Sequence, residues 1–269
     1  REQILKVHAR NKPLDKNADL NKISQQTPGF AGADLENLLN EAAILTAKRN
    51  KKTLGMSELE ESIEKVLMGP ERKSRVLSKK EKEITAYHET GHALVGHLLP
   101  NCDPVNKISI VSRGMALGVT WFLPEEDKHL SSRSKFEDEL CSLMGGYIAE
   151  ITVFGEMTTG ASNDLEKATN IARNMVTRYG MSDLGPIILG EQNHEVFLGR
   201  DFGHVRNYSE DVARQVDEQI KLILDKAKKR TIEIVTKNRA KLDEIAKYLI
   251  KKETINRAEF LKFFGEKGK

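Results

Sequence analysis

Apolar residues recur at helical spacing through the first seventy residues of the chain. Four segments carry the pattern: REQILKVHAR, ADLNKISQQT, GADLENLLNEAAILTAKRN and SELEESIEKVLMG. In the third segment the apolar residues lie three and four positions apart, which places them on one face of a helix. The polar stretch that follows contains Gly69 and Pro70 and is typical of a linker. The pattern predicts a small helical bundle over 1–70, a linker over 71–77 and a second domain over 78–269.

The second domain begins with a clear helix signal. Ser78 and Glu81 match a capping box, and apolar residues continue at helical spacing until Pro100. Beyond this helix, VNKISIVSR and GVTWFLP are β-branched or aromatic runs separated by a turn that contains glycine. These two runs predict a β-hairpin formed by 105–113 and 118–124.

Two further segments, SRSKFEDELCSLMGGYIAEITVFG and SNDLEKATNIARNMVTRYG, are helical in pattern. Gly145 and Gly146 fall within the first, where they predict close packing against a neighbouring element. We expect Ser162 or Asn163 to cap the second helix and Gly180 to end it.

Helical spacing is absent from 181–207 and returns in 208–252 and 256–264. Together these patterns predict a fold that is mainly α with a small β-hairpin or sheet.

Composition indicates a globular protein but does not identify a binding partner. The chain has 269 residues, 39% of them hydrophobic, enough for one large or two ordinary globular domains. A formal net charge of +3, from 43 basic and 40 acidic residues, carries no nucleic-acid signature. Cys102 and Cys141 lack the spacing of a thiolate metal site. No apolar run approaches the roughly 20 residues of a membrane span, so we expect the chain as given to be soluble.

The sequence HETGH at 88–92 is the strongest chemical signal in the chain. His88 and His92 lie one turn apart on the predicted helix, so both imidazoles can bind one metal ion. Glu89 is placed to act as a general base toward a water molecule that the metal activates. The alternative is a buried helix without metal, whose polar side chains would need several hydrogen bonds in apolar surroundings. The motif favours zinc-dependent peptide hydrolysis.

A catalytic zinc site needs a third protein ligand, which spacing leaves open. The extended HExxHxxGxxH pattern requires glycine and histidine where the chain has Val95 and Leu98. His97 lies about 140° further round the helix than His92 and is expected to point away from the ion. The remaining acidic candidates are Asp103, Glu150, Glu156, Asp164 and Glu166. Asp164 has the best local setting, in the first turn of a predicted helix, although the helix dipole alone also favours an acid there.

Four stretches together resemble a known family: GFAGADLENLLNEAA, HETGHALVGHLLP, VNKISIVSRGMALGVTWFLPEED and TTGASNDLEKATNIARNMVTRYGMS. They resemble the FtsH family of ATP-dependent AAA zinc proteases, over essentially the whole chain. The resemblance implies a helical AAA lid followed by a mostly helical HExxH zinc protease domain. It also implies that His88, His92 and Asp164 bind Zn²⁺ and that Glu89 is the catalytic base of a metalloendopeptidase.

The resemblance further implies partners outside the chain. In the family, the stretch that contains Gly29, Ala31 and Gly32 lies near the nucleotide. The chain has no GxxxxGK[ST] phosphate loop, so we expect ATP and Mg²⁺ to act only through a missing AAA core, and no autonomous ATPase activity. Family members are homo-hexamers with N-terminal membrane spans, and they degrade unfolded or membrane proteins. For the whole protein we expect the bacterial inner membrane, with this part in the cytoplasm; an organelle membrane is also compatible.

The predicted hairpin suggests a mode of substrate binding. An edge strand beside a zinc helix can pair with an extended peptide through main-chain hydrogen bonds, and Val119, Thr120 and Trp121 are the candidate residues. The alternative is that the apolar side chains of this strand simply cover the core.

A competing function is a ring-assembly module whose metal site is structural or silent. Structural zinc sites usually have four protein ligands, and a closed site has no use for a base such as Glu89.

Overall fold

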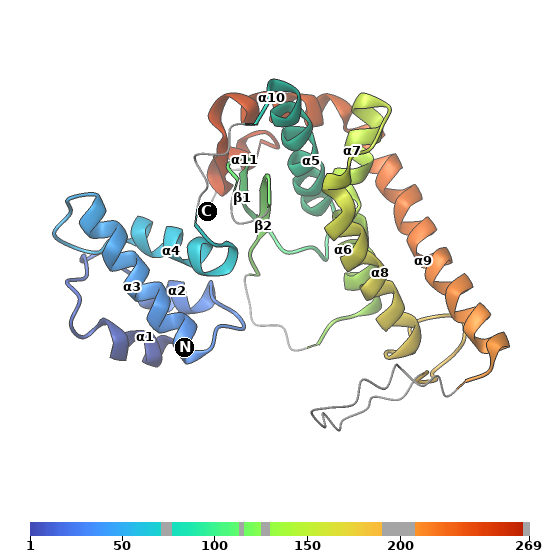
Figure 1. The fold of residues 1–269 in the computed structure, drawn as a ribbon, viewed down its shortest axis with the longest axis horizontal. Helices are drawn as coiled ribbons and strands as arrows, with labels where there is room; N and C mark the ends of the chain where they lie inside the picture. The colour runs from blue at the N-terminus through green and yellow to red at the C-terminus, as the bar shows by residue number, and fades with distance from the viewer. Residues whose placement is uncertain (71–76, 113–115, 125–129, 190–207, 266–269) are drawn as a thin grey trace.

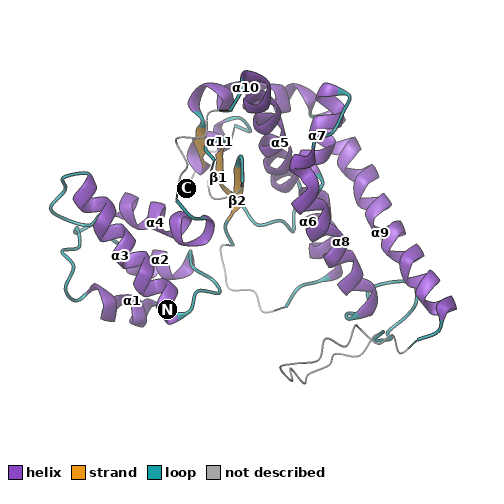
Figure 2. Ribbon diagram, in the orientation of Figure 1, coloured by secondary structure: helices purple, strands orange, loops and turns teal. Residues whose placement is uncertain are grey.

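The computed structural model describes residues 1–70, 77–112, 116–124, 130–189 and 208–265. Helices make up most of these ranges, and three short strands within them form a small sheet (Figure 2). The predicted fold class, mainly α with a small sheet, is confirmed.

The first four helices gather around a hydrophobic core of their own, on one side of the sheet (Figure 1). They are α1 (Glu2–Ala9), α2 (Leu20–Gln25), α3 (Gly32–Lys48) and α4 (Met56–Met68). Each helix contributes a fully buried aliphatic side chain to this core: Leu5, Ile23, Leu38 and Ile63. Burial of these apolar faces stabilises helices that are individually short. The helical bundle predicted from the sequence is present.

Helix α5 (Lys79–Leu98) is the central helix of the remaining chain. The predicted capping box is confirmed: the Glu81 backbone N–H donates to Ser78 Oγ, and the Ser78 N–H donates to the Glu81 carboxylate. The helix packs against α6 (Arg133–Leu143), α7 (Gly145–Phe154) and α10 (Arg239–Lys252). Because α5 is enclosed by these elements, its polar side chains between Thr85 and Gly96 are buried with its apolar ones.

Helices α5 and α7 approach each other through two facing glycines. A Cβ on Gly91 would lie 2.4 Å from the carbonyl oxygen of Gly145, and a Cβ on Gly145 would lie 2.5 Å from the carbonyl oxygen of Gly91. Neither separation is sterically allowed, so the two backbones touch where a side chain would hold them apart. The close packing predicted at Gly145 is confirmed, and its partner is the helix that carries the histidine pair.

The sheet has the strand order β2-β1-β3, with both pairings antiparallel. Its strands are β1 (Val105–Ser109), β2 (Val119–Phe122) and β3 (Thr254–Asn256). The predicted hairpin is confirmed as the β1–β2 pair, although both strands are shorter than expected. The sequence did not predict β3, because three residues between two helices are too few to show a strand period.

The helices that follow the hairpin differ in detail from the prediction. The first predicted helix is two helices, because α6 ends and α7 begins at Met144. Two glycines, which are weak helix formers, follow Met144 directly. Helix α8 (Ser162–Thr177) follows a short 3₁₀ turn, η1 (Thr159–Ala161), and its N-cap residue is Ala161. The predicted cap at Ser162 or Asn163 is therefore wrong, because the 3₁₀ turn already begins the helical path.

Helices α9 (Glu210–Lys237) and α11 (Arg257–Lys262) complete the described fold. Helix α9 packs along α6, α7 and α8, and α11 packs on β1 and β3 (Figure 1). Among the described residues, no helix combines the length and the apolar character that crossing a membrane requires.

Candidate metal centre

Helix α5 places His88 and His92 side by side in the interior. The two residues are 8% and 7% exposed, and the Nε2 atoms of their rings lie 3.0 Å apart. Residues four apart on a helix share a face, so this convergence follows directly from the HETGH spacing.

The other ring nitrogen of each histidine has a protein acceptor. His88 Nδ1 lies 2.6 Å from Oε1 of Glu150, on α7. His92 Nδ1 lies 2.8 Å from the carbonyl oxygen of Ser142, in the last turn of α6, where helix carbonyls lack an intrahelical partner. Both acceptors require a proton on Nδ1, so a neutral ring leaves the Nε2 lone pair free for a metal ion.

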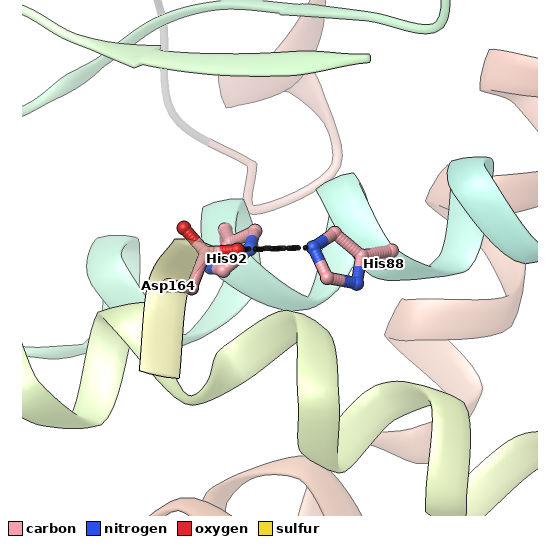
Figure 3. Close-up of side chains that lie close together, drawn as sticks. All are labelled: His88, His92 and Asp164. Carbon is pink, nitrogen blue, oxygen red and sulfur yellow. Dashed lines mark hydrogen bonds and ion pairs between the residues drawn. The ribbon is translucent and has the colours of Figure 1, made fainter. Parts of the chain in front are cut away.

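Asp164 completes the group from a different helix. It lies in the first turn of α8, and its Oδ2 atom is 3.3 Å from Nε2 of both His88 and His92 (Figure 3). Burial favours the neutral carboxyl, but hydrogen bonds and charge from the two histidines outweigh burial and hold the pKa of Asp164 well below its usual value. Asp164 is therefore expected to be ionised, as a carboxylate that binds a metal ion must be.

The three residues fit a metal cation. One donor atom from each lies within 4.8 Å of the others. The two Nε2 atoms lie 3.0 Å apart, and two lone pairs at this distance repel unless a proton or a metal cation lies between them. Burial lowers the pKa of His88, but Asp164, Glu150 and Glu89 raise it to about 10, so the surroundings attract positive charge strongly. Two nitrogens and one carboxylate oxygen are a donor set that zinc accepts.

The other acidic candidates from the sequence lie elsewhere. Asp103 pairs with Lys135, Glu156 pairs with Lys80 at the surface, and Glu166 is exposed. His97 packs its ring against Phe260 and Phe264, away from the histidine pair, as its angle on the helix predicted. Glu150 reaches the site, but through His88 Nδ1, on the side of the ring that faces away from Asp164.

Glu89 is also buried, at 7% exposure, and burial raises its pKa. The hydroxyl oxygen of Thr120, on β2, lies 2.8 Å from Oε2 of Glu89. Gly118 lies just before the same strand, and a Cβ there would come within 2.8 Å of Glu89 Oε1 and Cγ. The β2 strand therefore runs directly over the carboxylate that the sequence predicts to be the base.

Gly146 has a related role at the metal-binding group. A Cβ there would lie 2.6 Å from Nε2 of both His88 and His92. The first turn of α7 thus lies against the two nitrogens, and only glycine leaves room for them. Sequence reasoning found the glycine pair but not this contact, and it did not find the roles of Ser142 and Glu150; adjacent glycines inside a helical pattern were the available signal.

The residues predicted to touch substrate and nucleotide lie in two separate places. Val119, Thr120 and Trp121 are the first three residues of β2, an edge strand among the described strands. Gly29, with φ +78°, lies shortly before α3, and Gly32 is the first residue of that helix; α3 lies apart from α5 (Figure 1). Between the two glycines, the Ala31 N–H donates to the Asp34 carboxylate at 2.8 Å and so caps α3.

A histidine pair on a buried helix, an aspartate from a second helix beside it and an adjacent glutamate are the features of a metallopeptidase of the HExxH type. Comparison with known families agrees: residues 75–263 match the model of Peptidase family M41, and residues 17–61 match the AAA+ lid domain. The chain belongs to peptidase family M41.

Individual relatives give the same result. The chain is 55% identical over 267 residues to ATP-dependent zinc metalloprotease FtsH 1 of Sphaerobacter thermophilus. This alignment covers 99% of the chain and 41% of that relative. The chain is 53% identical to FtsH 1 of a Thermoanaerobacter species and 51% identical to FtsH 3 of a Synechocystis species, matching 98% and 96% of the chain and 43% of each relative. The chain thus spans about two fifths of the length of these curated relatives.

Proposed function

We propose that this chain is the proteolytic part of a longer ATP-dependent zinc endopeptidase. His88, His92 and Asp164 hold the zinc ion, and Glu89 is the general base. The observation that carries the proposal is the convergence of three ligand atoms within 4.8 Å beside a buried carboxylate. Relatives that are named zinc metalloproteases and match nearly the whole chain support it.

Zinc would supply Lewis acidity, which polarises a peptide carbonyl and lowers the pKa of a water molecule. Glu89 accepts a proton from this water as its oxygen attacks the carbonyl carbon. The carbon–nitrogen bond then breaks, and Glu89 delivers the proton to the leaving amine. The hydrogen bonds of Glu150 and Ser142 keep both histidine rings oriented throughout the reaction.

The β2 strand binds the substrate in this proposal. It is an edge strand among the described strands, and its residues are partly exposed. An extended peptide that pairs with the main chain of Val119, Thr120 and Trp121 would lie beside Glu89, because Thr120 contacts that residue. Main-chain pairing tolerates many sequences, which suits unfolded polypeptides as substrates.

The proposal extends to the organisation of the whole protein. Residues 1–70 form the AAA lid, 71–77 the linker and 78–269 the protease domain. The lid match over 17–61 and the separate hydrophobic core of the first four helices support this division; residues 71–76 lie outside the described part of the chain. The complete protein would be a membrane-anchored homo-hexamer of the bacterial inner membrane with this part in the cytoplasm, and Gly29, Ala31 and Gly32 would lie near ATP bound by its AAA core.

The ring-assembly alternative has less support. A structural zinc site would need a fourth protein ligand, and the group in the described residues has three.

The proposal is tested by hydrolysis of unfolded casein with a chelator, after zinc restoration, and with the Glu89→Gln variant. Cleavage that requires zinc and disappears in a zinc-loaded Glu89→Gln protein is the expected result. Equal cleavage by both proteins would contradict the role of Glu89.

A further inference from the structure

Thr120 holds the carboxylate of Glu89 from the opposite element. Its hydroxyl oxygen lies 2.8 Å from Glu89 Oε2 and 2.8 Å from the Glu89 carbonyl oxygen. The hydroxyl has one proton to donate, and a carboxylate is the stronger acceptor because the hydrogen bond is assisted by charge. In the part of the chain that the structure describes, this is the hydrogen bond that the Glu89 carboxylate receives.

The geometry of β2 explains why this strand reaches Glu89. Alternate residues of a strand point to opposite faces, and both Thr120 and Phe122 face α5. Phe122 lies against Gly96, where a Cβ would come within 2.4 Å of its ring, two helical turns beyond Glu89. The face of β2 that carries Thr120 is therefore fixed along α5 at both ends of this contact.

The base also has little freedom on its other side. Gly118 lies against Glu89 Oε1 so closely that a Cβ would be within 2.8 Å. Oε1 is thus covered by a glycine backbone, whereas Oε2 is held by the Thr120 hydroxyl. The two histidine rings are anchored through their Nδ1 atoms, and Thr120 gives Glu89 the corresponding anchor.

We propose that Thr120 is a positioning residue for the general base, because its hydroxyl orients the Glu89 carboxylate. A residue of β2, the strand proposed to bind the substrate, thus sets the placement of the base. The inference rests on the proposed function of Glu89. Positioning affects the chemical step more than ground-state binding, so loss of the hydroxyl lowers kcat and leaves KM nearly unchanged.

The test compares Thr120→Val with Thr120→Ser in the zinc-loaded full chain, using a fluorogenic peptide. Valine keeps the branched shape and removes the hydroxyl, whereas serine keeps the hydroxyl. We expect kcat to fall about tenfold in Thr120→Val with KM within about twofold, and Thr120→Ser to stay within about twofold of wild type. Thr254→Val, on β3 of the same sheet, is the matched control; its hydroxyl contacts Ser109 and it should keep wild-type kcat. If Thr120→Val folds poorly by circular dichroism, Thr120→Ser and Thr120→Ala provide the same comparison, because they differ only in the hydroxyl.

A second measurement does not depend on turnover. Acetohydroxamic acid gives up a proton when it binds a metal, and an oriented Glu89 carboxylate accepts that proton. Calorimetry on zinc-loaded proteins should show about tenfold weaker binding to Thr120→Val and to Glu89→Gln, with Thr120→Ser close to wild type. Wild-type kcat and wild-type hydroxamate affinity in Thr120→Val would overturn the positioning role. Failure of Glu89→Gln to change either quantity would instead overturn the proposed function itself.

Discussion

Glu150 connects His88 to the loop that leads to Asp164. One carboxylate oxygen lies 2.6 Å from His88 Nδ1, and the other accepts the backbone N–H of Thr158 at 2.7 Å. The residue therefore joins the helix with the histidine pair to the segment before α8, which carries Asp164. This one carboxylate thus links candidate ligands that lie far apart in the chain.

Replacing Glu150 should weaken metal binding without removing a ligand. In Glu150→Gln the amide is neutral, so it orients His88 less firmly and contributes no negative charge. We expect zinc affinity to fall about 10- to 100-fold, measured by competition with a chromogenic chelator. Glu156→Gln is the matched control, because Glu156 is exposed and its ion pair is with exposed Lys80. Equal affinities of the two variants would show that Glu150 does not support the site.

Loss of the Asp164 carboxylate should have a larger effect. Asp164→Asn replaces an ionised oxygen donor by a weaker neutral one, so we expect substoichiometric zinc after dialysis and no cleavage of casein. Glu166→Gln, which changes an exposed acid two residues away, should keep its zinc. Metal content is measured by atomic emission. A zinc-loaded Asp164→Asn protein would mean that the third ligand is another residue.

A single methyl group at Gly146 should close the space around the ligands. The added Cβ would lie 2.6 Å from Nε2 of His88 and His92, so one of these rings must move. We expect Gly146→Ala to bind zinc at least about tenfold more weakly than wild type while keeping its helical circular dichroism. Unchanged zinc affinity in this variant would show that α7 can withdraw from the histidines.

Thr90 lies within the histidine motif and has a buried hydroxyl with no partner among the described residues. A buried donor without a hydrogen bond is costly, so Thr90→Val should leave the free energy of unfolding unchanged or raise it by about 1 kcal/mol. The control is Thr231→Val, because the equally buried Thr231 hydroxyl donates to the Ala227 carbonyl at 2.8 Å. That variant should lose about 1 kcal/mol. Chemical denaturation of both proteins measures the difference.

The lid should lose stability in acid through Glu58. Burial opposes ionisation of this residue, but hydrogen bonds from Lys51 and Arg49 outweigh it and lower its pKa to about 2 from 4.5. A lowered pKa stabilises the fold above about pH 4.5, and this contribution is lost as pH falls toward 2. The melting temperature of wild type should therefore be higher than that of Glu58→Gln at pH 7. This difference in melting temperature should shrink between about pH 5 and pH 3. The melts are recorded with EDTA so that metal loss does not contribute; a difference independent of pH would contradict the assignment.

The sequence predicted local features of this fold better than distant ones. The capping box of Ser78 and Glu81, the α5 helix and the β1–β2 hairpin involve residues that are near each other in the chain. Strand β3 was missed because its pairing with β1 depends on residues almost one hundred and fifty positions away. Tertiary pairing of this kind leaves no periodic signal in a three-residue segment.

The site shows the same division. Helical spacing alone brought His88 and His92 together, since they lie one turn apart. Spacing left Asp164 among five acidic candidates, and resemblance to a known family singled it out; in the fold, Oδ2 of Asp164 lies 3.3 Å from both histidines. The supporting contacts of Glu150 and Thr120 come from α7 and β2, and only the packed structure shows which oxygen meets which nitrogen.

The position of β3 in the chain also sets the order in which the fold can be completed. Lys107, Ile108 and Ser109 of β1 pair with residues 254–256, so the third strand cannot join the sheet until those residues have been synthesised. Both α5 and β2 are synthesised much earlier. The strand that lies over Glu89 therefore belongs to a sheet that stays two-stranded until residues 254–256 have been made, well after β2 itself.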